Sequence, residues 1–342
     1  MIPKQKLEIK NYKKIAVTPR FCYFQPKAEL KSTISQEISY SLSQKKKFIH
    51  PKFFYDEAGS DLFEKICGLP EYYLTRTEIE VLSSMKSELS KYLVGNYALI
   101  ELGSGSSIKT RKLLKILTTK QNDVEYYPID ISNILKDSSI NLHDEYDNLK
   151  ITGIIDKYET GLEFIRQLDH KAKLVVFLGS SLGNFEPEHG IEFLGKIRSS
   201  MRKGDLFLLG IDLAKDAKIL ENAYNDSKGI TANFNLNLLS RINRELTANF
   251  DNDKFEHVAI FNKKQKRIEM YLKSKTKHEV FVSKINLSLK FKKGELIHTE
   301  YSYKYTVSQI KKMAQKTGFK PVQIWTDKNN YFAVILFSVD SL

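Results

Sequence analysis

The sequence is short of cysteine and of long apolar runs. Its only cysteines, Cys22 and Cys67, form no C-x-x-C pair, which speaks against a disulfide framework and a cysteine-ligated zinc site. Two thiols in 342 residues are typical of a reducing compartment, so we expect a cytoplasmic protein. No run of about 18 apolar residues is present, and the start, MIPKQKLEIKNYKK, lacks the apolar stretch of a secretory signal. We therefore expect no membrane-spanning helix and no membrane partner.

Motifs for metal binding and covalent catalysis are also missing. The seven histidines form no H-E-x-x-H or H-x-H pattern and no set with the cysteines, so we expect no metal. The G-x-S-x-G elbow of serine hydrolases does not occur either. These absences favour chemistry that uses neither a metal ion nor a covalent nucleophile.

The charge is unbalanced, with a formal net charge of +13. Such an excess raises the question of a nucleic-acid partner. The densest basic segments, residues 45–47 and 263–267, have no interleaved aromatic residues and read as solvated turns. We therefore favour a lysine-rich solvated surface and expect no nucleic-acid partner, although an RNA substrate remains an alternative.

A regular alternation of apolar segments begins near residue 76. A helical pattern at 78–93 precedes strand-like runs at 97–102, 124–129, 151–155, 174–179 and 206–213, and further helical patterns separate these runs. Several of these runs are apolar throughout, which is typical of parallel strands covered on both faces. The sequence thus predicts a doubly wound α/β core.

The pattern changes after residue 214. A helical stretch and alternating segments fill residues 215–304, and a helix at 307–316 precedes two strand-like runs joined by DKNN. That turn predicts an antiparallel hairpin. We expect an N-terminal arm on the surface (1–29), a core (76–214 and 305–342) and a second domain (30–75 and 215–304). Ligands of such sheets bind in the cleft at the carboxyl ends of the strands.

A glycine-containing loop, ELGSGSS at 101–107, joins the first predicted strand to a helix. Gly103 and Gly105 allow a tight turn and a close approach to a ligand, but Ile108 replaces the third glycine of a dinucleotide-binding loop. Asp130 ends the next strand, where it can accept both hydroxyls of a ribose, and Asp156 ends the one after it. Either aspartate alone could simply cap a helix, yet their recurrence at successive strand ends favours a ligand role.

The loop, the two acids and the terminal hairpin together resemble class I methyltransferases, which use S-adenosylmethionine (SAM). The resemblance implies a Rossmann-like doubly wound sheet with a C-terminal antiparallel hairpin, plus a smaller α+β substrate-binding domain. It also implies SAM as co-substrate. Methyl transfer fits the absences above, because the sulfonium of SAM is already a strong electrophile.

Longer motifs narrow the resemblance. FYDEAGSDLF (54–63), LPEYYLTRTE (69–78), FLGSSLGNFEP (177–187), EH (256–257), RIEM (267–270) and HTEYSYKY (298–305) occur in this order. From about residue 47 onwards the chain resembles the histidine N-alpha-methyltransferases of ergothioneine biosynthesis. Those enzymes convert L-histidine to its trimethylammonium betaine, hercynine, by three transfers from SAM. The usual Tyr-Tyr-Pro of the second motif reads Tyr72-Tyr73-Leu74 here.

The resemblance also implies roles for individual residues. The positions that match its cofactor site are Gly103, Lys109, Asp130, Asp156 and Lys157. Those that match the site for the amine and carboxylate of the amino acid are Gly179, Asn184 and Tyr224, with Asn184 and Tyr55 positioning the reacting amine. The rest of the substrate pocket corresponds to Tyr55, Tyr72, Thr231, Met270, Glu300 and Ser302.

Glu300 and Ser302 lie two residues apart in an alternating segment, so on a strand they face the same side. A carboxylate and a hydroxyl suit the donor and acceptor nitrogens of an imidazole. The residues alone, however, equally allow an exposed strand face with Glu300 and Lys304 solvated. They also allow Tyr55 and Tyr72 as core aromatics, and Asn184 as a turn residue.

Three other functions remain open. A relative could act on tryptophan or a prenylated tryptophan, but Glu300, Ser302 and Met270 argue against the larger indole. The others are an RNA methyltransferase, suggested by the charge, and a protein that binds SAM without turnover. We expect a monomer that acts on a small molecule, L-histidine and its mono- and dimethyl forms.

Overall fold

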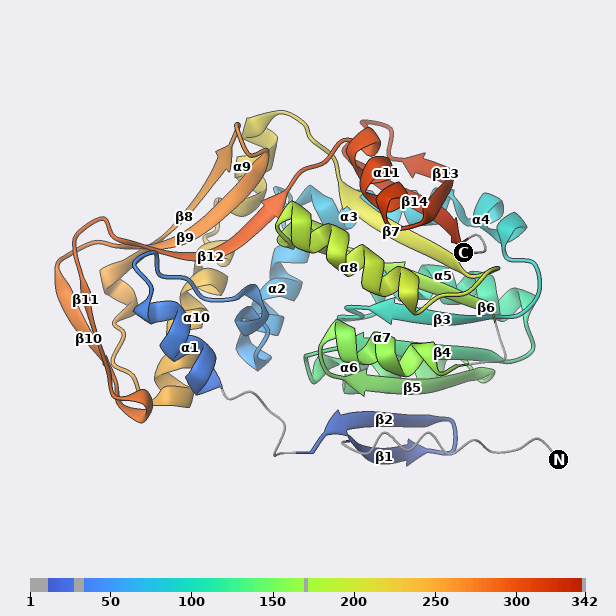
Figure 1. The fold of residues 1–342 in the computed structure, drawn as a ribbon, viewed down its shortest axis with the longest axis horizontal. Coiled ribbons are helices and arrows are strands. Elements are labelled where there is room, and N and C mark those ends of the chain that lie inside the picture. The colour runs from blue at the N-terminus through green and yellow to red at the C-terminus, as the bar shows by residue number, and fades with distance from the viewer. Residues whose placement is uncertain (1–11, 28–33, 169–171, 340–342) are drawn as a thin grey trace.

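The computed structural model describes residues 12–27, 34–168 and 172–339. A nine-stranded sheet has the order β1-β2-β5-β4-β3-β6-β7-β14-β13 and occupies one side of the molecule (Figure 1). Two smaller sheets, β12-β9-β8 and β10-β11, occupy the other side. The residues predicted to bind ligands come from both sides.

The centre of the large sheet consists of the five strands that the sequence predicted. All of them pair in parallel. Because helices cover both faces, β3 and β7 are buried at every position. The five strands are β3 (Tyr97–Leu102), β4 (Val124–Asp130), β5 (Leu149–Ile155), β6 (Ala172–Phe177) and β7 (Leu206–Asp212). The predicted parallel sheet is confirmed.

Helices cover both faces of the sheet. On one face α7, α8 and α11 bury Phe164, Phe193 and Ile310, and on the other α3 and α5 bury Val81 and Leu114. The helices of this part are α3 (Tyr73–Ser84), α4 (Lys86–Tyr92), α5 (Ile108–Lys120), α6 (Ile134–Glu145), α7 (Tyr158–Arg166), α8 (Pro187–Ser199) and α11 (Val307–Lys316). The helix predicted at 78–93 is thus two helices, α3 and α4. Throughout the described stretches, no helix combines the length and apolar character needed to cross a bilayer.

The C-terminal hairpin forms the edge of the large sheet next to β7. β13 (Phe319–Thr326) and β14 (Phe332–Val339) pair antiparallel, and β14 pairs antiparallel with β7. A capping box of Thr306 and Gln309 starts α11 just before the hairpin. The predicted hairpin is confirmed, and with it the class I strand arrangement.

The chain before residue 30 differs from the expected surface arm. β1 (Tyr12–Thr18) and β2 (Phe21–Pro26) form an antiparallel hairpin, and β2 pairs in parallel with β5. The sequence pattern hid this hairpin, because β1 is a short edge strand whose lysines remain exposed. Residues 1–11 of the expected arm lie outside the described residues.

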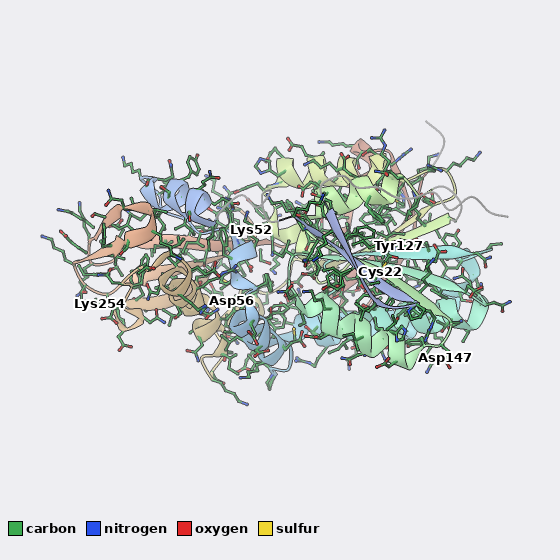
Figure 2. The ribbon with its side chains drawn as sticks, turned by 90° about the horizontal axis from the view of Figure 1, so that it is seen from below. Cys22, Lys52, Asp56, Tyr127, Asp147 and Lys254 are labelled. Atoms are coloured by element: carbon green, nitrogen blue, oxygen red, sulfur yellow. The ribbon has the colours of Figure 1, made fainter. Side chains whose placement is uncertain are left out.

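A smaller α+β unit packs around a core of its own, which includes Phe54, Phe234 and Leu272. In Figure 2, Lys52 and Asp56 mark the side of this unit that is nearer the large sheet, and Lys254 marks its outer end. Its elements are α1 (Ile34–Ser43), η2 (Pro51–Phe54), α2 (Glu57–Cys67), α9 (Ala217–Tyr224), α10 (Ile230–Leu246), η4 (Asn252–Lys254), β8 (Phe255–Asn262), β9 (Arg267–Ser274), β10 (His278–Val282), η5 (Ser283–Ile285), β11 (Leu287–Phe291) and β12 (Leu296–Tyr303). This shared core supports the proposed domain of residues 30–75 and 215–304.

Candidate active site

The glycine loop after β3 adopts the backbone conformation that its composition predicts. Gly103 has a φ of +77°, and a Cβ there would stand 2.9 Å from the Tyr158 hydroxyl. Gly105 also has a positive φ, and no atom lies within 4 Å of the place of its Cβ. Substitution would strain either position. The loop therefore keeps an open backbone surface at the carboxyl edge of the sheet.

Asp130, at the end of β4, is fixed against this loop. Its Oδ2 accepts from the Gly105 amide at 3.1 Å, and its Oδ1 accepts from the Ser132 amide at 2.9 Å. Burial raises the pKa of Asp130, while these backbone N–H groups lower it. The neighbouring Ile131 is an exposed apolar side chain. A carboxylate and an apolar surface thus stand together at the strand end.

Asp156 follows β5, the strand next to β4, so both aspartates lie at the same edge. Its Oδ1 accepts from the Lys157 amide at 2.7 Å, and its Oδ2 accepts from the hydroxyl of Tyr12. The Lys157 side chain is exposed at the start of α7. The structure therefore brings Gly103, Asp130 and Asp156 to one edge.

These residues fit SAM. The open backbone at Gly105 allows a close approach, and the Asp130 carboxylate has lone pairs left for ribose hydroxyls. Asp156 at the adjacent strand end would accept from the adenine amino group. When bound, SAM supplies a methyl group on a sulfonium, which is a strong electrophile.

Glu78 ends the LPEYYLTRTE motif and is buried, and no role for it was apparent from the sequence. Its two carboxylate oxygens accept from the Gly179 amide at 2.8 and 3.0 Å, and Oε2 also accepts from Lys109 Nζ at 2.9 Å. Burial alone would lower the pKa of Lys109, but the Glu78 charge outweighs it and leaves that pKa raised. Glu78 therefore fixes Gly179 and Lys109, two of the predicted site residues. The feature of the sequence that could have indicated this role is a charged residue on the apolar face of α3.

Glu101 anchors the glycine loop from beneath. It is 2% exposed and accepts from Thr110 Oγ1 at 2.7 Å and from the Tyr126 hydroxyl at 2.5 Å. Burial raises its pKa to about 7, although both hydrogen bonds oppose the shift. These contacts join β3, β4 and α5 directly below the cofactor loop.

Glu300 and Ser302 lie on β12, and both are buried, with 8% and 3% of their surface exposed. Glu300 pairs with Met270 on β9, and Met270 is buried as well. Burial raises the pKa of Glu300 to about 7, although the Lys304 ammonium lowers it. Among the described residues, no group donates a hydrogen bond to this carboxylate. The alternative of a solvated strand face is therefore wrong, and so is a solvated Lys304, which is 1% exposed.

Three tyrosines predicted to line the pocket feel the charge of Glu300. Burial raises the pKa of Tyr55, Tyr72 and Tyr224, and the Glu300 charge adds to the shift in each case. Their rings form a chain through Phe63: the centroids are 5.6 Å apart from Tyr55 to Phe63, 6.3 Å from Phe63 to Tyr72, and 6.2 Å from Tyr72 to Tyr224. All three phenols thus keep their protons at neutral pH and can only donate or accept hydrogen bonds.

A buried network holds Ser302 from behind. Ser302 Oγ accepts from the Tyr224 hydroxyl and from Lys304 Nζ, both at 2.9 Å. Lys304 Nζ also donates to the Tyr224 hydroxyl at 3.1 Å and pairs with Asp212 at 2.8 Å. The Tyr73 hydroxyl donates to the same aspartate at 2.8 Å. The network ties β12 to the end of β7 and thus joins the pocket to the sheet.

The remaining predicted residues have different surroundings. Thr231 is buried at the start of α10, where its amide donates to Asp226 at 2.7 Å. Asn184 ends η3 (Ser181–Asn184) and is exposed, and no hydrogen bond joins its side chain to another described residue. η3 packs tightly on β12, because a Cβ on Gly183 would stand 2.8 Å from the Tyr303 carbonyl oxygen. Asn184 therefore lies on an element that contacts the strand carrying Glu300.

The described residues contain no group of three or more His, Cys, Asp or Glu side chains arranged to hold a metal ion. The strand order, the glycine loop and the aspartates at successive strand ends instead define a class I SAM-dependent methyltransferase.

Comparison with known proteins identifies the family within this class. The family model described as histidine-specific methyltransferase, SAM-dependent, matches residues 34–339, and the chain belongs to that family. It is 38% identical to histidine N-alpha-methyltransferase of Mycolicibacterium smegmatis, over 89% of this chain and 94% of the relative. Ergothioneine biosynthesis protein 1 of Neurospora crassa is 29% identical over 81% of this chain, which spans 32% of that longer protein. L-tryptophan methyltransferase of Psilocybe serbica is 26% identical over 82% of this chain and 85% of the relative.

Proposed function

We propose that this protein is a histidine N-alpha-methyltransferase, which methylates the α-amine of L-histidine three times with SAM to give hercynine, the first step of ergothioneine biosynthesis. Its substrate is a small molecule, and the active unit is a monomer. The observation that carries the proposal is the buried pair of Glu300 and Ser302 on one face of β12, where the Tyr224 hydroxyl donates to Ser302.

The hydrogen bonds around this pair favour a neutral imidazole. The Glu300 carboxylate has no donor among the described residues, and a buried carboxylate without a partner is costly. Both lone pairs of Ser302 Oγ are occupied by Tyr224 and Lys304, so its own proton remains to be donated. One group therefore accepts an N–H and the other donates to a bare nitrogen, as a neutral imidazole requires.

The same pair disfavours tryptophan. An indole offers one N–H donor but no acceptor nitrogen, so Glu300 would be satisfied and the Ser302 proton would not. Leaving a buried polar group unpaired is the strongest way in which a pocket rejects an analogue. Nothing comparable favours an RNA substrate.

The reacting amine must be neutral to carry a lone pair. Burial keeps the phenols of the pocket protonated, and the Glu300 carboxylate is assigned to the imidazole N–H, so neither is the base for the amine. Tyr55 and Asn184 would therefore orient the amine, while its proton leaves to water. Glu78 would hold the Gly179 backbone at the carboxylate end. Orientation and exclusion of water then account for most of the rate.

The test is to incubate the protein with SAM and single amino acids, and to follow products by mass spectrometry. The proposal expects histidine to gain one, two and three methyl groups in succession. Tryptophan, phenylalanine and tyrosine serve as matched controls that lack the imidazole. Equal methylation of tryptophan, or no methylation of histidine, would refute it.

A further inference from the structure

The β1–β2 hairpin lies outside the part of the chain that the family model matches, which begins at residue 34. The hairpin is nonetheless built into the core. Phe21 and Phe24 are buried, and the Arg20 guanidinium donates to the carbonyl of Tyr146 at 2.9 Å and to that of Asp147 at 2.6 Å. Figure 2 shows the hairpin, with Cys22, across the edge of the sheet. It is thus a fixed element of this protein.

The strand register brings one end of the hairpin to the ligand edge. β2 runs parallel to β5, with Phe21 opposite Ile151 and Phe24 opposite Ile154, so both strands end at the same edge. β1 precedes β2 in the chain and pairs antiparallel with it, which places Tyr12, at the start of β1, opposite Pro26, at the end of β2. Figure 1 shows β1 and β2 beside β5. Tyr12, at the start of β1, lies beside Asp156, the residue that follows β5.

At that position the Tyr12 hydroxyl donates to Asp156 Oδ2. The other oxygen, Oδ1, accepts from the Lys157 amide at 2.7 Å. Two donors on different oxygens fix the rotation of the carboxylate. Each oxygen keeps one further lone pair, so the carboxylate can still accept from a ligand. Burial raises the pKa of Tyr12, and Asp156 adds to the shift, so the phenol stays a donor.

We propose that Tyr12 is a positioning residue of the SAM site, which holds the Asp156 carboxylate in the orientation that accepts the 6-amino group of adenine. The proposal rests on the assignment of Asp156 to the adenine end of SAM within the proposed function. It makes the N-terminal hairpin, which the family match does not include, a part of the cofactor site.

The test measures binding rather than turnover. Calorimetry gives the Kd of S-adenosylhomocysteine and of S-inosylhomocysteine, which carries a carbonyl oxygen in place of the 6-amino group. The unaltered protein should prefer the adenosyl compound. Tyr12→Phe should weaken adenosyl binding by about tenfold, the effect of one hydrogen bond to a charged group, and leave inosyl binding nearly unchanged. The preference for adenine should fall by the same factor.

Tyr23→Phe is the matched control, because it removes a phenol oxygen from the same hairpin without touching Asp156. It should leave both Kd values and their ratio unchanged. If the ratio of the two Kd values is unaltered in Tyr12→Phe, the proposal is overturned. An equal loss of affinity for both compounds is one such result, and it indicates a structural role only.

Asp156→Asn separates this proposal from its premise. If Asp156→Asn abolishes the preference for adenine and Tyr12→Phe does not, Tyr12 has no positioning role although the adenine assignment stands. If Asp156→Asn leaves the preference intact, the adenine assignment and the role of Tyr12 both fail. Neither result bears on histidine methylation, which the mass-spectrometric test decides separately.

Discussion

Replacing Glu300 with glutamine keeps the size of a buried side chain and removes its charge. Burial raises the pKa of this carboxyl to about 7 from the ordinary value of 4.5. Because a difference of one in pKa between the folded and unfolded chain corresponds to about 1.36 kcal/mol, ionised Glu300 costs the folded protein about 3 kcal/mol of unfolding free energy. We therefore expect Glu300→Gln to be more stable than the unaltered protein at alkaline pH.

The sign of the pH dependence follows from the direction of the shift. Below the ordinary glutamate pKa, Glu300 is protonated in both the folded and the unfolded chain, and the substitution gains nothing. As the pH rises from about 4.5 to about 7, the unfolded chain ionises first, and the unaltered protein loses stability. Above that range the difference between the two proteins stays constant.

Urea unfolding at about pH 5 and about pH 9 measures this difference. The gain in unfolding free energy for Glu300→Gln should approach about 3 kcal/mol at the higher pH and be less than about 1 kcal/mol at the lower. Glu279→Gln is the control, because that glutamate is exposed on β10. It should change stability by less than about 0.5 kcal/mol at either pH.

The same substitution should weaken histidine binding. A neutral amide accepts the imidazole N–H less strongly than a carboxylate, and we expect the Kd of histidine to rise at least about tenfold. SAM affinity should not change. Equal stability differences at the two pH values would refute the burial argument, and an unchanged histidine Kd would refute the assignment of the imidazole pocket.

Three further predictions follow from the site. Asp130→Ala should weaken SAM binding by about 1.5–3 kcal/mol through lost charge-assisted hydrogen bonds, and unchanged affinity by calorimetry would place the ribose elsewhere. For histidine and its dimethyl form, kcat/KM should rise from neutral to alkaline pH, and a flat pH profile would contradict the neutral-amine account. Tyr55→Phe should slow turnover, and Asn184→Ala should slow it more. Lys304→Met should cost about 1–3 kcal/mol of unfolding free energy, because buried Asp212 then keeps the ammonium of Lys215 but loses that of Lys304. In a double-mutant cycle with Asp212→Asn, the double variant should lose less than the sum of the two single losses, and additive losses would disprove the coupling.

The sequence was most informative where burial is uniform. β3 has the predicted bounds, Tyr97–Leu102, because a strand covered on both faces reads as one apolar run. The turn at Gly103 and the acid at Asp130 were predictable for a similar reason, since each is fixed by its own short segment. Local pattern and fold agree at these positions.

The sequence could not show which residues far apart along the chain contact one another. Lys304 appeared solvated in an alternating segment, but its ammonium is buried against Asp212, on a strand of the other unit, and against the Tyr224 hydroxyl. Glu78 likewise acts on Gly179, 101 residues later. The β1–β2 hairpin was missed because its exposed lysines masked the pairing of β2 with β5. Topology creates these contacts, and no periodicity encodes them.

The position of the transferred methyl groups tests the central claim most directly. Histidine labelled with ¹⁵N at the α-amine is incubated with SAM carrying a ¹³C-labelled methyl group, and the product is examined by NMR. The account predicts a one-bond coupling between ¹³C and ¹⁵N, with three equivalent methyl groups on the α-nitrogen at completion. Methyl carbons on a ring nitrogen, or no labelled histidine product, would contradict it.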